Sequence, residues 1–147
     1  MSLEDNKAIV QRYFEAVKKR NLALADELVA PDYFHRGFKV RSRKEWKHSM
    51  TLVLNAFPDY LEMIEDIMAE GDKVWVRYKG TGTNKGEYGG IPATGKKATY
   101  EAVSIYRIAD GKIVEMWGVS DMLDFYKQLG IIEYTEKGKK LFPEDVK

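Results

Sequence analysis

The sequence contains no cysteine at any of its 147 positions. Disulfide bonds, a thiol nucleophile and thiolate metal ligands are therefore excluded. Histidine occurs only twice, as His35 and His48, and two unpaired histidines do not predict a histidine-rich metal site. We accordingly expect no metal ion in this protein.

Long apolar runs and an excess of one charge sign are also missing. No stretch approaches the ~20 consecutive apolar residues that a membrane-spanning helix needs, and residues 1–7 lack the apolar core of a secretion signal. The chain has 24 Lys and Arg against 23 Asp and Glu, which predicts no basic patch for nucleic acid or an acidic membrane surface. We expect a cytoplasmic protein that binds neither nucleic acid nor membranes.

The composition is that of one globular domain. A chain of this length buries roughly two thirds of the surface of its unfolded state, so it can pack a core and still enclose a cavity. Aromatic residues make up 12% of the chain, and its nine tyrosines and three tryptophans suit a mostly apolar site with a few polar tips. We interpret residues 1–147 as a single domain with a core of about 5–130 and a C-terminal tail of 131–147.

Helical periodicity dominates the N-terminal part of the chain. Apolar residues at helical spacing predict a helix over residues 5–19 and, after a shorter helix that Pro31 ends, another over residues 43–56. Ser42 is the expected N-cap of the latter helix. The aromatic run at residues 33–38 predicts a short strand between the second and third helices.

Strand-like alternation replaces the helical period from about residue 60 to residue 120. Turns at residues 70–72 and at Asp110-Gly111 predict two hairpins, and a final helix is expected to begin near Asp121 and end before Gly130. Helices followed by antiparallel strands predict an α+β domain in which a curved sheet wraps against helices. Such a cone-shaped arrangement encloses a natural cavity for a small molecule.

Alternation along the last predicted strand places carboxylates beside large apolar groups. One face is expected to carry Ile113, Glu115, Trp117, Val119 and Asp121, a mixture more typical of a pocket wall than of a core. Asp121 has two interpretations. It either caps the final helix, or it lies partly desolvated at a cavity mouth, where a raised pKa would suit general acid/base chemistry.

The remaining polar residues of interest also have alternative roles. His35 is either a packed histidine or a pocket residue, since its imidazole titrates near neutral pH. His48 lies off the apolar stripe of its helix and is expected at the surface. Arg77 is predicted to be a solvent-facing charge, with an ion pair to Glu101 or Asp121 as the alternative.

The sequence is similar to the SnoaL-like polyketide cyclase, or ester cyclase, branch of the nuclear transport factor 2-like superfamily. Three motifs carry this resemblance, which extends over about residues 5–130. They are Phe57-Pro58-Asp59, residues 90–96 with the sequence GIPATGK, and residues 106–121. The chain departs from the family pattern at Phe34, where relatives often have a polar residue such as Asn.

The resemblance implies a fold, an assembly and a reaction. The fold is a cone-shaped α+β barrel of the nuclear transport factor 2-like or cystatin-like type, commonly paired into a homodimer through its sheet. The reaction is an intramolecular aldol ring closure of a small hydrophobic carbonyl or ester compound, without metal or cofactor.

The resemblance also implies roles for individual residues. Asp121 matches the family's acid/base aspartate, and His35 matches a recurrent pocket histidine that would donate a hydrogen bond to the developing oxyanion. We expect a set of aromatic side chains to line the pocket: Tyr13, Phe14, Trp46, Trp75, Tyr106 and Trp117.

Two other functions are consistent with this sequence. The domain could bind a hydrophobic small molecule without converting it. Alternatively, it could act as an epoxide hydrolase or isomerase, which needs a water molecule between two acids and an arginine. The candidates for that set are Arg77 and Asp121 with either Glu101 or Glu115.

Overall fold

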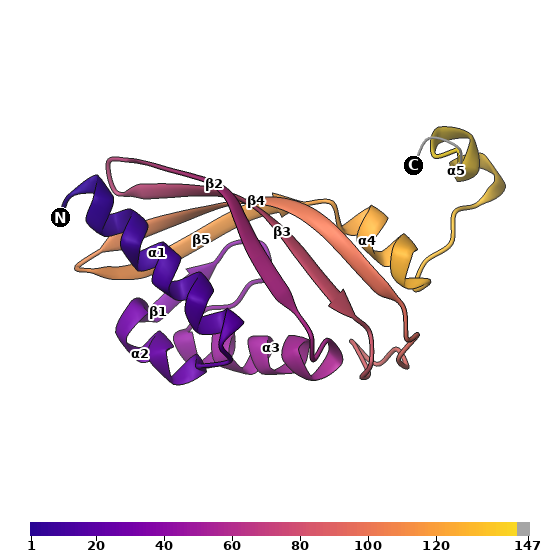
Figure 1. The fold of residues 1–147 in the computed structure, drawn as a ribbon, viewed down its shortest axis with the longest axis horizontal. Helices are drawn as coiled ribbons and strands as arrows, with labels where there is room; N and C mark the ends of the chain where they lie inside the picture. Colours follow the sequence, from indigo (N-terminus) through magenta and orange to yellow (C-terminus); the bar gives the residue numbers. More distant parts are fainter. Residues whose placement is uncertain (144–147) are drawn as a thin grey trace.

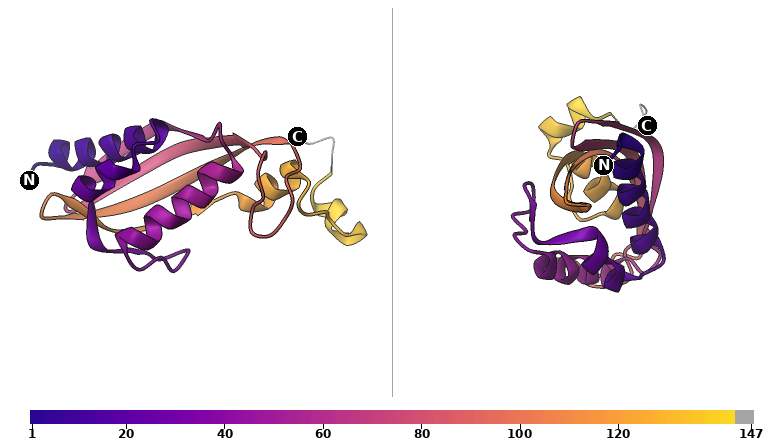
Figure 2. Two further views of the ribbon diagram at one scale, coloured as in Figure 1. Left: turned by 90° about the horizontal axis from the view of Figure 1, so that it is seen from below. Right: turned by 90° about the vertical axis from the view of Figure 1, so that its left-hand side faces the viewer.

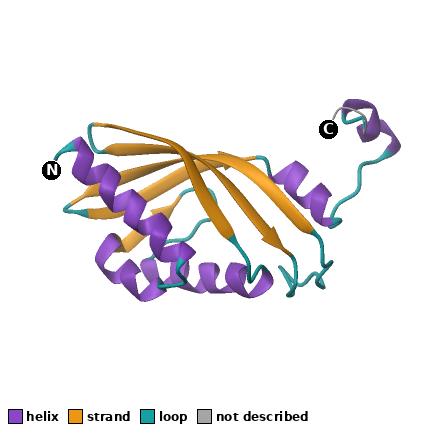
Figure 3. Ribbon diagram, in the orientation of Figure 1, coloured by secondary structure: helices purple, strands orange, loops and turns teal. Residues whose placement is uncertain are grey.

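The computed structural model describes residues 1–143 and consists of a curved five-stranded sheet with helices packed against it (Figures 1 and 3). The strand order is β1-β5-β4-β3-β2. The strands are β1 (Val29–His35), β2 (Leu61–Glu70), β3 (Lys73–Thr83), β4 (Lys97–Ala109) and β5 (Lys112–Ser120). The expected α+β class is confirmed. The sheet is not purely antiparallel, however, because β1 pairs in parallel with β5.

Side-chain caps begin four of the five helices of residues 1–143, and α2 (Ala25–Leu28) begins without one. The capped helices are α1 (Leu3–Lys18), α3 (Arg43–Ala56), α4 (Met122–Leu129) and α5 (Glu136–Leu141), and a 3₁₀ turn lies at Leu22–Leu24. The Ser42 hydroxyl caps α3 by accepting a hydrogen bond from the Glu45 N–H at 3.1 Å, as predicted. Gly130 ends α4 in the left-handed conformation, with a φ of 75°.

Both predicted hairpins are present, and the first strand is longer than expected. Gly71 and Gly111 make the turns with φ values of 57° and 74°, which glycine adopts without steric cost. β1 begins at Val29 rather than near residue 33. Pro31 is compatible with this strand because β1 lies at the edge of the sheet, where a missing N–H need not break a ladder.

Alternation gives the sheet two distinct faces. The inner face, which carries Val74, Val76 and Tyr78 of β3, packs against the N-terminal helices (Figure 2). The outer face carries Trp75 and Arg77, whose side chains are exposed. The main core therefore lies between the inner face and the apolar stripe of α1.

The C-terminal part of the described chain extends away from this core. Figure 1 shows α5 standing apart from the sheet, and Leu141 at its end is 78% exposed. A stack of Tyr134 on Phe142, with ring centroids 4.7 Å apart, holds the segment together locally. Across residues 1–143, no helix is both long and apolar enough to cross a membrane.

Candidate functional site

Asp121 caps the last helix, which is one of the two roles predicted for it. Its carboxylate accepts a hydrogen bond from the Asp124 N–H at 3.2 Å, and its own N–H donates to the Glu101 carbonyl at 3.2 Å. Because Ser120 pairs with Ala102 on the inner face, the next pair, Asp121 with Glu101, faces outward. The Asp121 side chain is exposed on this outer face.

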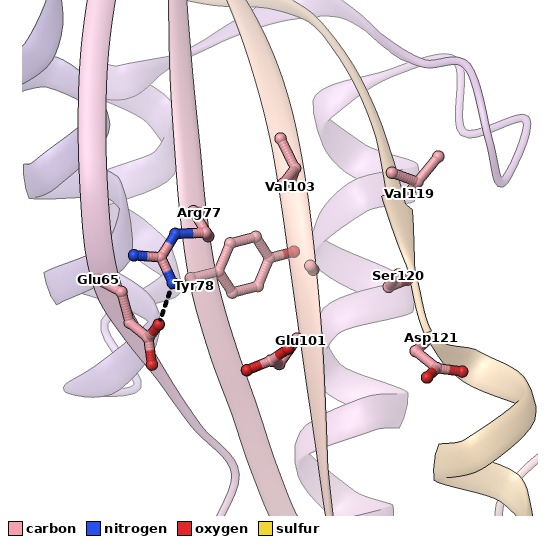
Figure 4. A pocket seen from close by; sticks show the side chains of 9 residues that line it. Glu65, Arg77, Tyr78, Glu101, Val103, Val119, Ser120 and Asp121 are labelled. Carbon is pink, nitrogen blue, oxygen red and sulfur yellow. Dashed lines mark hydrogen bonds and ion pairs between the residues drawn. The ribbon is translucent and has the colours of Figure 1, made fainter.

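A shallow hollow of about 270 Å³ lies in the outer face beside Asp121 (Figure 4). Arg77 crosses part of it and pairs with Glu65 at 2.5 Å between Nη1 and Oε2. Lys79 bridges the Glu65 and Glu101 carboxylates at 3.2 and 3.8 Å. Arg77 is therefore a surface charge, as predicted, and its partner is Glu65 rather than Glu101 or Asp121.

The Glu115 carboxylate is engaged elsewhere on the same face. It forms ion pairs with Arg36 and, at 3.2 Å, with Arg107. These two guanidinium groups lower the pKa of Glu115, chiefly through the hydrogen bond from Arg36. The arginine-oriented pair of acids that epoxide hydrolysis would need is thus not assembled from Arg77, Asp121 and Glu115.

His35 lies on the inner face, beside Met116 of β5. The ring is buried, and its Nδ1 accepts hydrogen bonds from the N–H groups of Gly37 at 3.1 Å and Phe38 at 3.3 Å. Nδ1 is therefore unprotonated, and the neutral ring carries its proton on Nε2. Burial lowers the pKa of His35 and favours this neutral form.

The two residues predicted to act together are not brought together. His35 pairs with Met116, and Asp121 follows Met116 by five residues, which corresponds to ~16 Å along an extended strand. The two side chains also lie on opposite faces of the sheet. Their catalytic roles remain predictions, but they do not form a pair around one small ligand in this structure.

One of the five residues predicted to share a face of β5 lies on the opposite face. Glu115, Trp117, Val119 and Asp121 share the outer face, as alternation predicts. Ile113 does not, because a register shift between Arg107 and Ile108 places it opposite Ile108, where it is fully buried. An irregularity of this kind reverses the phase of every residue beyond it.

The predicted pocket aromatics divide between the two faces. Tyr13, Phe14, Trp46 and Tyr106 meet inside the fold, where the Trp46 indole N–H donates to the Tyr13 hydroxyl at 3.0 Å. All four are at most 6% exposed, so they form part of the packed core.

The remaining two predicted pocket residues lie elsewhere. Trp75 and Trp117 flank Ile105 on the outer face, and Trp75 is 43% exposed. They lie apart from the four inner aromatic residues, because alternation along their strands turns them away from the helices. Their role as pocket-lining residues remains a prediction.

Glu62 is the acid that sequence reasoning missed. It lies in β2 opposite Gly80, on the inner face, and it retains partial exposure. The Tyr60 hydroxyl donates to its Oε1 at 2.5 Å and also lies 2.5 Å from the Tyr100 hydroxyl. Burial raises the pKa of Glu62, and hydrogen bonding by the Tyr60 and Tyr100 hydroxyls opposes part of this rise.

A sequence signal for Glu62 exists but is weak. Glu62 and Ile64 have the same phase, so a carboxylate appears on an otherwise apolar face. The register shift between Ile64 and Asp66 then interrupts the alternation, and the phase cannot be followed through the strand.

Tyrosines surround Glu62 on the inner side of the sheet. Burial raises the pKa of each of them, which keeps the phenols protonated and able to donate hydrogen bonds. They are Tyr13, Tyr60, Tyr78, Tyr100 and Tyr106. A carboxylate with a raised pKa beside neutral phenols can remove a proton from carbon and stabilise the oxyanion that results.

Residues 1–143 contain no group of three or more His, Asp or Glu side chains arranged to hold a metal ion.

Comparison with known proteins connects this chain to a family of cyclases. The sequence profile described as SnoaL-like polyketide cyclase matches residues 7–129. DauD, the aklanonic acid methyl ester cyclase of Streptomyces sp. strain C5, is 30% identical over 142 residues, which cover 92% of this chain and 88% of DauD. DnrD, the corresponding cyclase of Streptomyces peucetius, is 30% identical over 129 residues, covering 83% of this chain and 88% of DnrD.

The solved structures agree with the sequence comparisons. AclR of Streptomyces galilaeus, a candidate hydroxylase, superimposes with a TM-score of 0.79 at 31% identity, over 90% of this chain and 100% of AclR. A family profile that spans most of the chain and relatives matched over most of their length together define the membership. This protein belongs to the SnoaL-like polyketide cyclase family.

Proposed function

We propose that this protein is a cytoplasmic, cofactor-free acid/base enzyme that closes a ring in a small hydrophobic carbonyl or ester compound. The relatives DauD and DnrD are named as cyclases of aklanonic acid methyl ester, which supports this substrate class. The observation that carries the proposal is the Glu62 carboxyl, which burial gives a raised pKa beside the Tyr60 hydroxyl.

An intramolecular aldol reaction needs only one such carboxyl group. The Glu62 carboxylate removes a proton from the carbon next to a carbonyl, and the C–H electron pair forms the enolate. The enolate carbon bonds to a second carbonyl carbon, whose oxygen becomes an alkoxide. The protonated Glu62 then returns its proton to that oxygen, so that one residue serves first as base and then as acid.

The experiment that tests this proposal compares the two candidate bases directly. Cyclisation of aklanonic acid methyl ester is followed chromatographically with the Glu62→Gln and Asp121→Asn variants. We expect Glu62→Gln to lower kcat by about 10²- to 10⁴-fold, the usual contribution of a general acid/base. Asp121→Asn should change kcat by less than about 3-fold, because an N-cap asparagine replaces an aspartate well.

A large loss of kcat in Asp121→Asn, with little change in Glu62→Gln, would assign the catalytic role to Asp121 and reject Glu62. If the wild-type protein binds the ester in calorimetry but leaves it unchanged, the domain is a binding module.

We also propose a homodimer that forms through the outer face. The N-terminal helices cover the inner face of the sheet (Figure 2). The outer face exposes four large apolar side chains. Met63, Met68, Trp75 and Val119 are 42%, 61%, 43% and 75% exposed. A second copy of this sheet matches the patch, because one two-fold axis buries the same apolar surface on both chains.

Light scattering after size exclusion tests the dimer. Trp75→Arg should convert it to a monomer, because it places a charge at the centre of the buried patch. Phe38→Arg is the matched control, since Phe38 is also exposed, at 73%, but lies in a loop outside the sheet. A dimer that survives Trp75→Arg would reject the outer face as the interface.

A further inference from the structure

We propose that Tyr60 and Tyr100 are the hydrogen-bond donors of the Glu62 site, and that Gly80 is the residue that positions them. The arrangement itself stands on the geometry of three neighbouring strands. The catalytic part of the inference rests on the proposed function, since the donors act on the oxyanion of that reaction.

Glu62, Gly80 and Tyr100 form one row across β2, β3 and β4. Glu62 pairs with Gly80, and Gly80 pairs with Tyr100, so all three share the inner face. Two strand spacings separate the ends of the row by ~10 Å. The Tyr100 side chain therefore extends across β3 to reach the Tyr60 hydroxyl, which is hydrogen-bonded to Glu62.

Gly80 makes this crossing possible. A Cβ atom at Gly80 would lie 2.3 Å from Cζ of Tyr100 and 2.5 Å from its hydroxyl oxygen. Ordinary van der Waals contact begins near 3.4 Å, so the ring would have to move by about 1.1 Å to accept even a methyl group. Gly80 is thus the position over which the Tyr100 ring lies.

Packing on the far side fixes the ring in this place. Tyr100 makes an edge contact with Phe125 of α4, with centroids 5.2 Å apart, and with Tyr78 at 6.3 Å. A ring held from both sides has little freedom to swing away from Tyr60. The phenol is therefore pre-positioned rather than gathered when a ligand binds.

The hydrogen bonds in this cluster have a defined direction. An ionised carboxylate only accepts hydrogen bonds, so the Tyr60 hydroxyl donates its proton to Glu62. Tyr60 oxygen can then only accept in its 2.5 Å contact with Tyr100, which becomes the donor. The result is a chain that runs from Tyr100 through Tyr60 to Glu62.

The direction of these hydrogen bonds gives Tyr60 and Tyr100 a role in the proposed reaction. When Glu62 takes the substrate proton, its oxygen no longer carries the charge that held the Tyr60 proton. The Tyr60 hydroxyl is then free to donate to the enolate oxygen, and Tyr100 supports it by donating in turn. Return of the proton from Glu62 to the alkoxide restores the carboxylate and the original chain.

Among residues 1–143, the titratable groups that face Glu62 are tyrosines. Tyr60 comes directly before β2, Tyr78 lies on β3, Tyr100 and Tyr106 lie on β4, and Tyr13 lies on α1. These neutral phenols can lower the pKa of the carboxyl only by donating hydrogen bonds. Loss of one donor should therefore raise the Glu62 pKa further.

The experiment measures the Glu62 pKa by ¹³C NMR and kcat on the same variants. Tyr100→Phe removes the hydroxyl and keeps the ring, whereas Gly80→Ala keeps the hydroxyl and displaces the ring. Gly82→Ala is the matched control, since it lies two residues further along the same face but contacts Phe57 instead. We expect both test variants to raise the Glu62 midpoint and lower kcat by about 100-fold, with Gly82→Ala close to wild type.

The two readouts separate this inference from the proposed function, because the NMR titration needs no substrate. An unchanged Glu62 midpoint in Tyr100→Phe would overturn the hydrogen-bond chain, whatever the activity. A raised midpoint with unchanged kcat would overturn the catalytic role of the two phenols. A wild-type protein that binds but does not convert the ester would instead reject the proposed reaction, and with it the donors' role, while a raised midpoint would still support the chain.

Discussion

Glu62→Gln should stabilise the folded protein at neutral and alkaline pH while it removes activity. The variant keeps the size of the side chain and the oxygen that accepts the Tyr60 hydrogen bond, and it removes the charge. Burial raises the pKa of Glu62 above its ordinary value of 4.5, so the folded protein holds this proton more tightly than the unfolded chain does. Above pH 4.5, ionisation of Glu62 therefore lowers the free energy of the unfolded chain more than that of the folded protein.

The pH dependence follows from this difference. The stability that Glu62 contributes is fully present below the unfolded pKa, and it is lost as the pH rises through the folded pKa. The loss amounts to about 1.4 kcal/mol for each unit by which the folded pKa exceeds the unfolded one. The Glu62 pKa that NMR measures in the folded protein therefore predicts how far Glu62→Gln should raise the free energy of unfolding at pH 8.

Urea unfolding at pH 5, 6, 7 and 8 measures this gain as a difference in the free energy of unfolding. Each kcal/mol should also raise Tm by about 2–4 °C. Glu101→Gln is the control, since Glu101 lies on the outer face with its side chain 72% exposed and should show no comparable trend. A Glu62→Gln variant that is less stable than wild type at pH 8 would refute the reasoning, because the charge would then be stabilising.

Two further predictions concern His35 and Asn84. Burial lowers the pKa of His35, so its contribution to stability is present above the ordinary pKa of 6.5 and is lost as the pH falls toward the folded value. In His35→Asn the free energy of unfolding should therefore fall less steeply with decreasing pH than in the wild-type protein, whereas His48→Gln should leave this dependence unchanged. Equal slopes in the two variants would contradict the burial argument. Asn84 is fully buried, and its Oδ1 accepts from the Thr94 N–H at 2.9 Å. Asn84→Ala should lower the free energy of unfolding in urea by about 1–3 kcal/mol, because the partly buried Thr94 N–H loses its acceptor. A loss below about 0.5 kcal/mol would show that water replaces the amide.

The predictions that held depend on neighbours in the sequence. Ser42 caps α3, and Gly71, Gly111 and Gly130 make the turns and the helix end that were expected. Each of these outcomes is decided within four or five residues, by a hydroxyl near an N–H group or by a backbone that accepts a positive φ. Such signals do not need the rest of the fold.

The two faces of the strands are a different case. Alternation shows which residues share a face, and it correctly grouped Trp117 with Asp121. It does not show which face the helices cover, since an apolar face can pack inside or pair with another chain. Trp75 was therefore grouped with Tyr13 and Phe14 as a pocket residue, although it lies on the opposite face of the sheet. Register shifts, such as the one beside Ile108, change the phase without a sequence signal that one strand alone provides.

The sequence by itself determined the fold class, the helix ends, the hairpin turns and the family resemblance, because these follow from local chemistry and from similarity along the chain. The tertiary structure alone decided that Asp121 and His35 lie on opposite faces, and that Glu62 meets Tyr100. Those two partners are brought together by register across three strands, over an intervening glycine whose missing side chain leaves the necessary space. Proximity between distant residues depends on every pairing between them, which no local pattern specifies.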